Sequence, residues 1–206
     1  MATTDYVSLP QTKTVLDGTE YGALQEAGGG TDSSFNYQMS ALADYITRYK
    51  TGYFHYNDLA TTASPFTHSG AGGFLPLPCD GLGARTSDVF KPIGVSDLWN
   101  TTTNQFDFSS LSNGDRVDIH IDLTATTSSN NQEVLLKSVM AIGGDSYSLN
   151  AAHVIIKSSG VFNVLKEVSF SIDDDNTRLN PAEIQIDSDS SISVVVNGLF
   201  IRVVRR

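Results

Sequence analysis

Hydrophobic and polar residues alternate with a period of two along the C-terminal half of the chain. The clearest run covers residues 115–127, where Val117, Ile119 and Ile121 are each followed by a polar residue. Because successive side chains of a strand point to opposite faces, this run predicts a long strand with one buried face and one polar face.

Other segments share this alternation, and loops rich in Ser, Asn, Gly and Asp separate them. The further strand candidates are residues 103–108, 132–142, 146–157, 161–172, 182–187, 191–196 and 199–205. Short strands in this number, without a convincing helix, predict an antiparallel jelly-roll sandwich over residues 97–206. The expected fold class is therefore mainly β, with a small mixed N-terminal region.

The last two candidates flank an Asn-Gly pair, which predicts a two-residue hairpin with positive φ at Asn197 and Gly198. The cross-strand pairs expected on the core face are Val196–Leu199, Val194–Ile201 and Ile192–Val203. On the other face Val195 would oppose Phe200. An apolar pair outside the core needs cover, so we expect Val195 and Phe200 at or near a homo-oligomer interface.

The first 96 residues divide into two zones. Residues 1–56 are mixed, and Leu42, Tyr45 and Ile46 recur there at helical spacing, which predicts a short helix. Residues 57–96 are rich in Gly and Pro, which oppose both helices and central strands, so we expect an irregular connector with one short strand near residues 74–77. The predicted organisation is an attachment region at 1–56, a connector at 57–96 and a jelly-roll knob at 97–206.

Composition narrows the classes of partner. The 206 residues are 40% hydrophobic and 17% charged, as in a globular protein, and carry a formal net charge of −10. Phosphate binding needs concentrated Lys and Arg, so nucleic acid is not an expected partner. The N-terminus lacks a signal-peptide pattern, and no apolar run approaches the roughly 20 residues of a membrane helix, so membrane insertion is not expected.

Candidate chemistry is sparse. Asp118, His120 and Asp122 share one strand face and include ordinary metal ligands, but a solvated or trimer-axis surface is the preferred interpretation. Residues 173–175 are an acidic run without the Gly and Glu of a calcium loop, which favours a surface turn. Cys79 is the only cysteine, and its Pro- and Gly-rich surroundings indicate an inert loop residue. We therefore expect no catalytic, cofactor or metal site, and no cofactor.

Sugar-binding sites usually contain exposed aromatic residues with Asp and Asn nearby. Trp99, Tyr147 and Phe162 are the candidates in this chain. Each is expected in the core or an interface instead, because aromatic rings gain much free energy from burial.

Two stretches carry a family resemblance. Leu9-Pro10, Val15-Leu16-Asp17-Gly18-Thr19-Glu20 and residues 40–46 resemble the N-terminal segment of bacteriophage fibre proteins. Leu98-Trp99-Asn100, residues 106–111 and residues 128–131 resemble the jelly-roll knob of trimeric phage fibres, similar to the tumour-necrosis-factor fold.

The resemblance implies a non-enzymatic virion structural protein, a short trimeric fibre or spike. Its implied partners are other copies of the chain, phage capsid, portal or tail proteins, and a host-surface polysaccharide or receptor. Residues implied in virion attachment are Asp17, Gly18, Thr19, Glu20, Leu42, Tyr45 and Ile46. A capsid decoration protein without receptor binding and a small polysaccharide-active enzyme are the alternatives.

Overall fold

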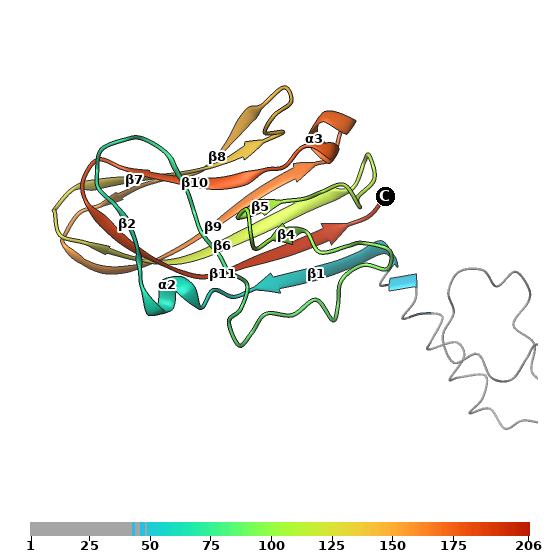
Figure 1. Cartoon of the computed structure of the whole chain (residues 1–206), viewed down its shortest axis with the longest axis horizontal. Coiled ribbons are helices and arrows are strands. Elements are labelled where there is room, and N and C mark those ends of the chain that lie inside the picture. Colours follow the sequence, from blue (N-terminus) through green and yellow to red (C-terminus); the bar gives the residue numbers. More distant parts are fainter. Residues whose placement is uncertain (1–42, 44–45, 48) are drawn as a thin grey trace, which may run out of the picture.

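The computed structural model describes Ala43, residues 46–47 and residues 49–206 (Figure 1). The attachment candidates at 17–20, Leu42 and Tyr45 lie outside the described residues. Where the predicted short helix is described, it is helical, and the Thr47 hydroxyl donates to the Ala43 carbonyl at 2.8 Å. The remaining attachment candidate, Ile46, has an exposed side chain.

Two antiparallel sheets make up the sandwich. Sheet I has the order β1 (Thr51–Tyr56), β11 (Ile192–Val204), β6 (Arg116–Thr127) and β9 (Gly160–Ser171), and β2 (Phe66–His68) also pairs with β11. Sheet II has the order β3 (Leu75–Pro76), β10 (Glu183–Ser188), β7 (Gln132–Met140) and β8 (Tyr147–Ile156). The smaller elements are β4 (Trp99–Asn100), β5 (Gln105–Phe106), α2 (Ala60–Ala63) and α3 (Asp175–Leu179).

The strand order is that of a jelly roll. Of the eight principal strands in chain order, the first pairs with the last (β1–β11), the second with the seventh (β3–β10), the third with the sixth (β6–β9) and the fourth with the fifth (β7–β8). This nested pairing wraps four antiparallel pairs into two sheets. The predicted fold class, an antiparallel β sandwich, is confirmed.

The sandwich extends beyond the expected 97–206. Strand β1 comes from the predicted N-terminal region, because Gly52, Phe54 and Tyr56 alternate inward in register with β11. Strand β3 comes from the predicted connector, where Pro76 is tolerated because β3 is an edge strand. Strand β3 falls within the short strand expected near residues 74–77, although the sequence did not predict that this strand joins the sandwich.

Strand β11 corrects the predicted hairpin, which is wrong. The strand continues through Asn197 and Gly198, and its register with β6 shifts between Val196 and Gly198. Neither central residue is among the described residues with positive φ. The predicted cross-strand pairs therefore do not form.

The six apolar residues of those pairs are nevertheless all buried in the core: Ile192, Val194, Val196, Leu199, Ile201 and Val203. The first three stand at even positions and the last three at odd positions, so a regular strand would turn one set toward solvent. The extra residue at the bulge brings both sets onto the same face. The Asn-Gly pair thus marks a change of parity within one strand.

Groups from the β1–α2 corner satisfy the backbone atoms that the bulge removes from the ladder. The Val196 amide donates to Thr61 Oγ1 at 2.8 Å, and Asn57 Nδ2 donates to the Asn197 carbonyl. The Thr61 hydroxyl in turn donates to the buried Asp58 carboxylate. The short helix α2 and the segment before it therefore stabilise the bulge of β11. Helix α2 lies beside β11 in Figure 1.

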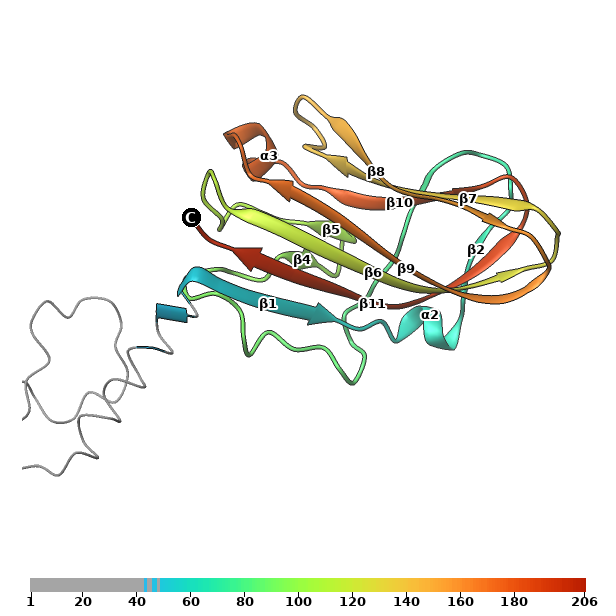
Figure 2. The ribbon, with the colours of Figure 1, turned by 180° about the vertical axis from the view of Figure 1, so that it is seen from behind.

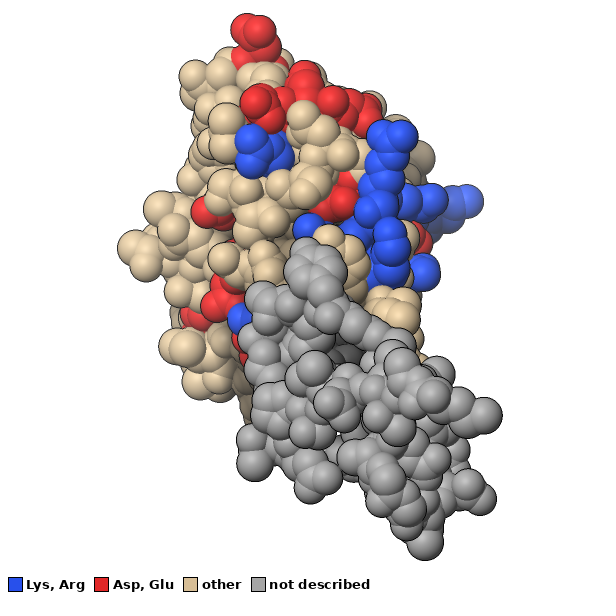
Figure 3. All heavy atoms as spheres, turned by 90° about the vertical axis from the view of Figure 1, so that its right-hand side faces the viewer, with Lys and Arg blue, Asp and Glu red and all other residues tan. Residues whose placement is uncertain are grey.

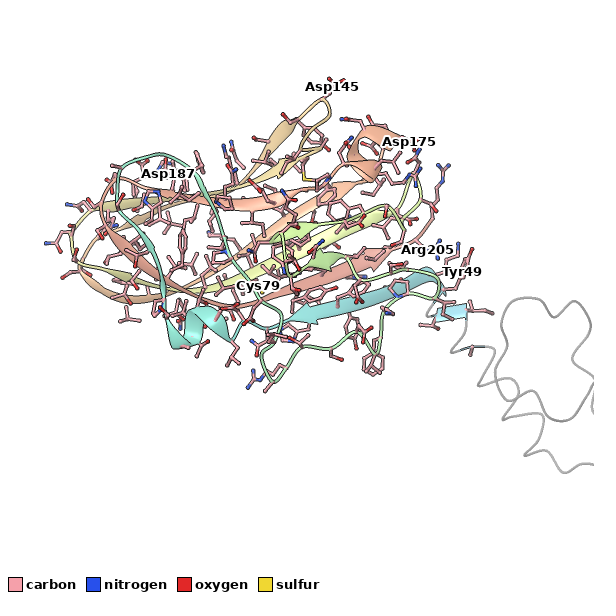
Figure 4. The ribbon with its side chains drawn as sticks, in the orientation of Figure 1. Tyr49, Cys79, Asp145, Asp175, Asp187 and Arg205 are labelled. Atoms are coloured by element: carbon pink, nitrogen blue, oxygen red, sulfur yellow. The ribbon has the colours of Figure 1, made fainter. Side chains whose placement is uncertain are left out.

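The two ends of the sandwich differ. The described chain enters beside its own C-terminus, where the Arg205 amide donates to the Lys50 carbonyl at 2.7 Å and the Arg205 guanidinium lies 5.0 Å from the Tyr49 ring (Figures 2 and 4). Lys and Arg side chains gather on this end (Figure 3). The β2–β3, β6–β7, β8–β9 and β10–β11 loops form the opposite end, near Asp187 (Figure 4).

We predict that Thr61→Val destabilises the protein by about 1–3 kcal/mol, because it leaves the buried Val196 amide without its acceptor at nearly constant side-chain volume. Urea unfolding would measure the loss. The matched control is Thr62→Val, since Thr62 is exposed and lies outside the bulge contacts. Equal losses in the two variants would contradict this role of Thr61.

Candidate functional site

A groove of about 580 Å³ lies on the outer face of sheet I, directly over the bulge. Strand β1 and the segment before α2 form one wall, and β6 and β9 form the other. Its lining includes His55, Asn57, Arg85, His120, Asp122, Leu165, Asn197 and Phe200. The volume falls in the range of about 300–1,000 Å³ that is typical of small-ligand sites.

Three rings form one row across three neighbouring strands. Phe200 of β11 is in register with His55 of β1 and His120 of β6. The ring centroids of these histidines lie 6.2 and 5.8 Å from that of Phe200, at interplanar angles of 69° and 70°. The Tyr53 ring also contacts Phe200, with a distance of 5.5 Å between the two ring centroids. Phe200 is therefore half-buried by rings of its own chain, with part of its surface left open to the groove.

A side-chain network fixes the acidic group of the groove. Asn197 Nδ2 donates to Asp122 Oδ1 at 2.9 Å and to Thr124 Oγ1 at 3.0 Å. Among the described residues, no group donates to the second oxygen of Asp122. The exposed Arg85 likewise makes no hydrogen bond or ion pair within the described part of the chain. The groove thus offers a positioned acceptor and an unengaged donor.

The polar face of β6 is confirmed as one face, but its residues have different surroundings. Asp118 is buried, whereas His120 and Asp122 reach the groove. His120 Nε2 lies 3.8 Å from a carboxylate oxygen of Glu167. Within the described residues, no three His, Cys, Asp or Glu side chains come together in a way that could hold a metal ion.

Asp118 is an anchored charge rather than part of the groove. Its Oδ1 accepts from Ser169 Oγ at 2.7 Å and from Arg116 Nε at 2.9 Å. Burial raises the pKa of Asp118, but these hydrogen bonds and the charges of Arg116 and Arg202 outweigh it, so its pKa lies below the usual range. The ionised form is therefore stabilised by folding.

The other sequence candidates are structural. Trp99 is buried, and its indole donates to the Cys79 carbonyl at 2.8 Å. Phe162 packs against the core. Tyr147 lies outside the core and is 39% exposed, and its hydroxyl forms a hydrogen bond with Thr177 Oγ1 at 3.0 Å. Burial raises the pKa of the Cys79 thiol to about 12, which opposes formation of a nucleophilic thiolate.

The acidic run has a definite structural role. Asp174 caps α3 by accepting from the Thr177 amide at 2.8 Å, so the run begins a short helix where a turn was expected.

Of the two interface candidates, Phe200 lines the groove and Val195 is half-buried on the same outer face, outside the groove lining. His55, Asn57 and Arg85 were not among the site residues expected from the sequence. The row of His55, Phe200 and His120 depends on the register of β1 with β11, which no local pattern in the sequence specifies.

Comparison with known proteins identifies no family. Neither a protein-family model nor a curated protein sequence matches the chain. Similar solved structures include a chain of infectious bursal disease virus Gx strain, at a TM-score of 0.40 and 10% identity, with 76% of this chain and 33% of that chain covered. The present chain thus spans about a third of the length of that neighbour.

For two further solved structures, the alignment covers most of this chain and most of the other chain. A chain from naturally occurring empty particles of cowpea mosaic virus aligns at a TM-score of 0.28 and 10% identity, over 77% of this chain and 82% of that one. A chain of sacbrood virus of honeybee aligns at 0.28 and 11% identity, over 91% and 86%. Likeness at these scores is loose, so the fold assignment rests on the strand pairing itself. No helix in the described residues is long and apolar enough to cross a membrane.

We predict that Asp118→Asn lowers the free energy of unfolding by about 1 kcal/mol at neutral pH, because the neutral amide loses the charge-assisted part of its hydrogen bonds. Because the pKa of Asp118 is lower in the folded state, its ionised carboxylate stabilises the fold at pH values above the unfolded-state pKa of about 3.9. This stabilisation is lost as the pH falls through the folded-state pKa. The difference from wild type should therefore shrink in acid.

Urea unfolding at a series of pH values would check this. Asp173→Asn serves as the control, because Asp173 is exposed. A difference between Asp118→Asn and wild type that stays constant into acid would contradict the stated role of the Asp118 charge.

Proposed function

We propose that the protein is a virion structural protein, a short trimeric fibre or spike whose N-terminal part attaches to the particle and whose jelly roll projects toward the host surface. The observation that carries the proposal is the separation of the two ends of the sandwich. The described chain enters beside Arg205, and the β2–β3, β6–β7, β8–β9 and β10–β11 loops lie at the far end. A domain anchored through its N-terminal segment would present those loops outward.

The composition of the far end supports a role in contact with the surroundings. Its loops are built mainly from Ser, Asn and Gly, in residues 128–131, 157–160, 188–191 and 69–73. Such loops are typical positions for binding residues on a rigid scaffold. The resemblance of the chain to phage fibre segments adds the virion context, since a jelly roll alone hosts many functions.

Self-association is the second part of the proposal, and sheet I offers a reason for it. The edge at β1 is covered, because the Tyr53 amide donates to the Phe90 carbonyl at 3.0 Å and His55 pairs with Ser87. The edge at β9 has no pairing strand in the described chain, and Val161 of β9 is 67% exposed. A ring of subunits would protect this edge and cover Val195.

We predict that the full chain is a trimer in solution and that Val195→Asp shifts it toward monomer, because a buried unpaired carboxylate opposes the contact. Light scattering after size-exclusion chromatography would give the mass. Ser148→Asp, an exposed position on sheet II, is the matched control and should leave the trimer intact. A monomeric wild type, or a Val195→Asp trimer, would contradict an interface at Val195.

The function itself is tested with virus that carries a deletion of residues 51–206. Intact particles that no longer adsorb to the host would support host attachment. Intact particles that adsorb normally would contradict it and favour a decoration protein. Release of reducing sugar from host polysaccharide by the purified chain would contradict the non-enzymatic assignment.

A further inference from the structure

We propose that the groove on the outer face of sheet I binds an uncharged pyranose unit of a host-surface saccharide. This inference deepens the proposed attachment function and rests on it for the biological source of the sugar. The binding itself is a property of the groove and can be tested on the purified chain.

The shape and the apolar part of the groove fit a sugar ring. A pyranose has one face of C–H groups, which packs on aromatic rings, and a rim of hydroxyls. Phe200 supplies an aromatic surface between the imidazoles of His55 and His120. Leu165, 66% exposed on β9, extends the apolar wall. The cavity of about 580 Å³ accommodates a ligand of this size.

The polar groups fit the hydroxyl rim. Asp122 is held by Asn197 and keeps one carboxylate oxygen for a ligand O–H group. Arg85 carries donors that no described residue uses, and it lines the same groove. An acceptor held in place by its neighbours loses little entropy on binding, which favours a directional hydrogen bond to a hydroxyl.

The charge of the groove selects against an acidic sugar. Among the described residues, Arg85 is the only Lys or Arg in the groove lining, while Asp58 and Asp122 line it and Glu167 lies beside His120. The chain as a whole carries a formal net charge of −10. An anionic saccharide would meet repulsion from these carboxylates, so the favoured ligand is neutral.

The groove depends on the bulge, which gives the site a structural basis. Asn197, the residue that positions Asp122, is itself held through its carbonyl by Asn57. A Cβ atom at Gly198 would lie 3.0 Å from the Tyr56 carbonyl oxygen and 3.2 Å from His55 Nε2. Glycine at this position therefore lets β1 and β11 approach and keeps His55 beside Phe200.

Saturation-transfer NMR on the full chain tests the proposal with glucose, galactose, mannose and N-acetylglucosamine, and with N-acetylneuraminic acid as the anionic comparison. We expect transfer to at least one neutral sugar and none to the acid. Arg85→Ala and Asp122→Asn should each weaken the binding about tenfold, as expected when one charge-assisted hydrogen bond is lost. Lys157→Ala, an exposed residue at the far end, is the matched control and should bind as wild type does.

Three results would overturn the proposal. They are no transfer to any neutral sugar, equal binding by Arg85→Ala and wild type, and a loss of trimer in the Arg85 and Asp122 variants, which would identify a second copy of the chain as the occupant. Failure of the attachment function is distinguishable. In that case the purified chain binds sugar through the groove, while virus with the Arg85 and Asp122 substitutions adsorbs normally.

Discussion

The bulge in β11 is the constraint on which the rest of the structure depends. Apolar residues occupy even positions before Asn197 and odd positions after Gly198, and all of them must reach one core. An extra residue in the strand is the local solution that keeps both halves inward. Its cost is a set of backbone groups without ladder partners, and Thr61 and Asn57 satisfy these from the β1–α2 corner. The bulge therefore connects the core, the β1–α2 corner and the outer face of sheet I.

The same coupling explains why the groove lies where it does. Because the bulge interrupts the regular ladder, Asn197 turns toward β6 and holds Asp122. The close approach of β1 at Gly198 places His55 next to Phe200. Both features lie on the outer face, which the core leaves free for contacts with other molecules.

Much of the sandwich was readable from the sequence because long strands with one buried face show period-two alternation, as in β6 and β9. The fold class followed from those strands. A short strand near residues 74–77 was expected and is β3, but its pairing with β10 was not, because two residues carry too little pattern to specify a partner strand. The hairpin prediction failed because the pattern around Asn197-Gly198 is shared by a tight turn and a bulge, and only pairing with β6 separates them. The groove was partly predictable: His120 and Asp122 share a face of β6, but Arg85 reaches them only through the tertiary fold.

In the proposed arrangement, the jelly roll is anchored on a virion with its loop end outward. A cryo-electron microscopy map of particles from the virus that encodes the chain tests it most directly. We expect threefold density that fits the sandwich, with Lys50 and Arg205 toward the particle and the loop at residues 188–191 pointing away. Particles that lack this density, or density with the 188–191 loop toward the particle, would contradict it.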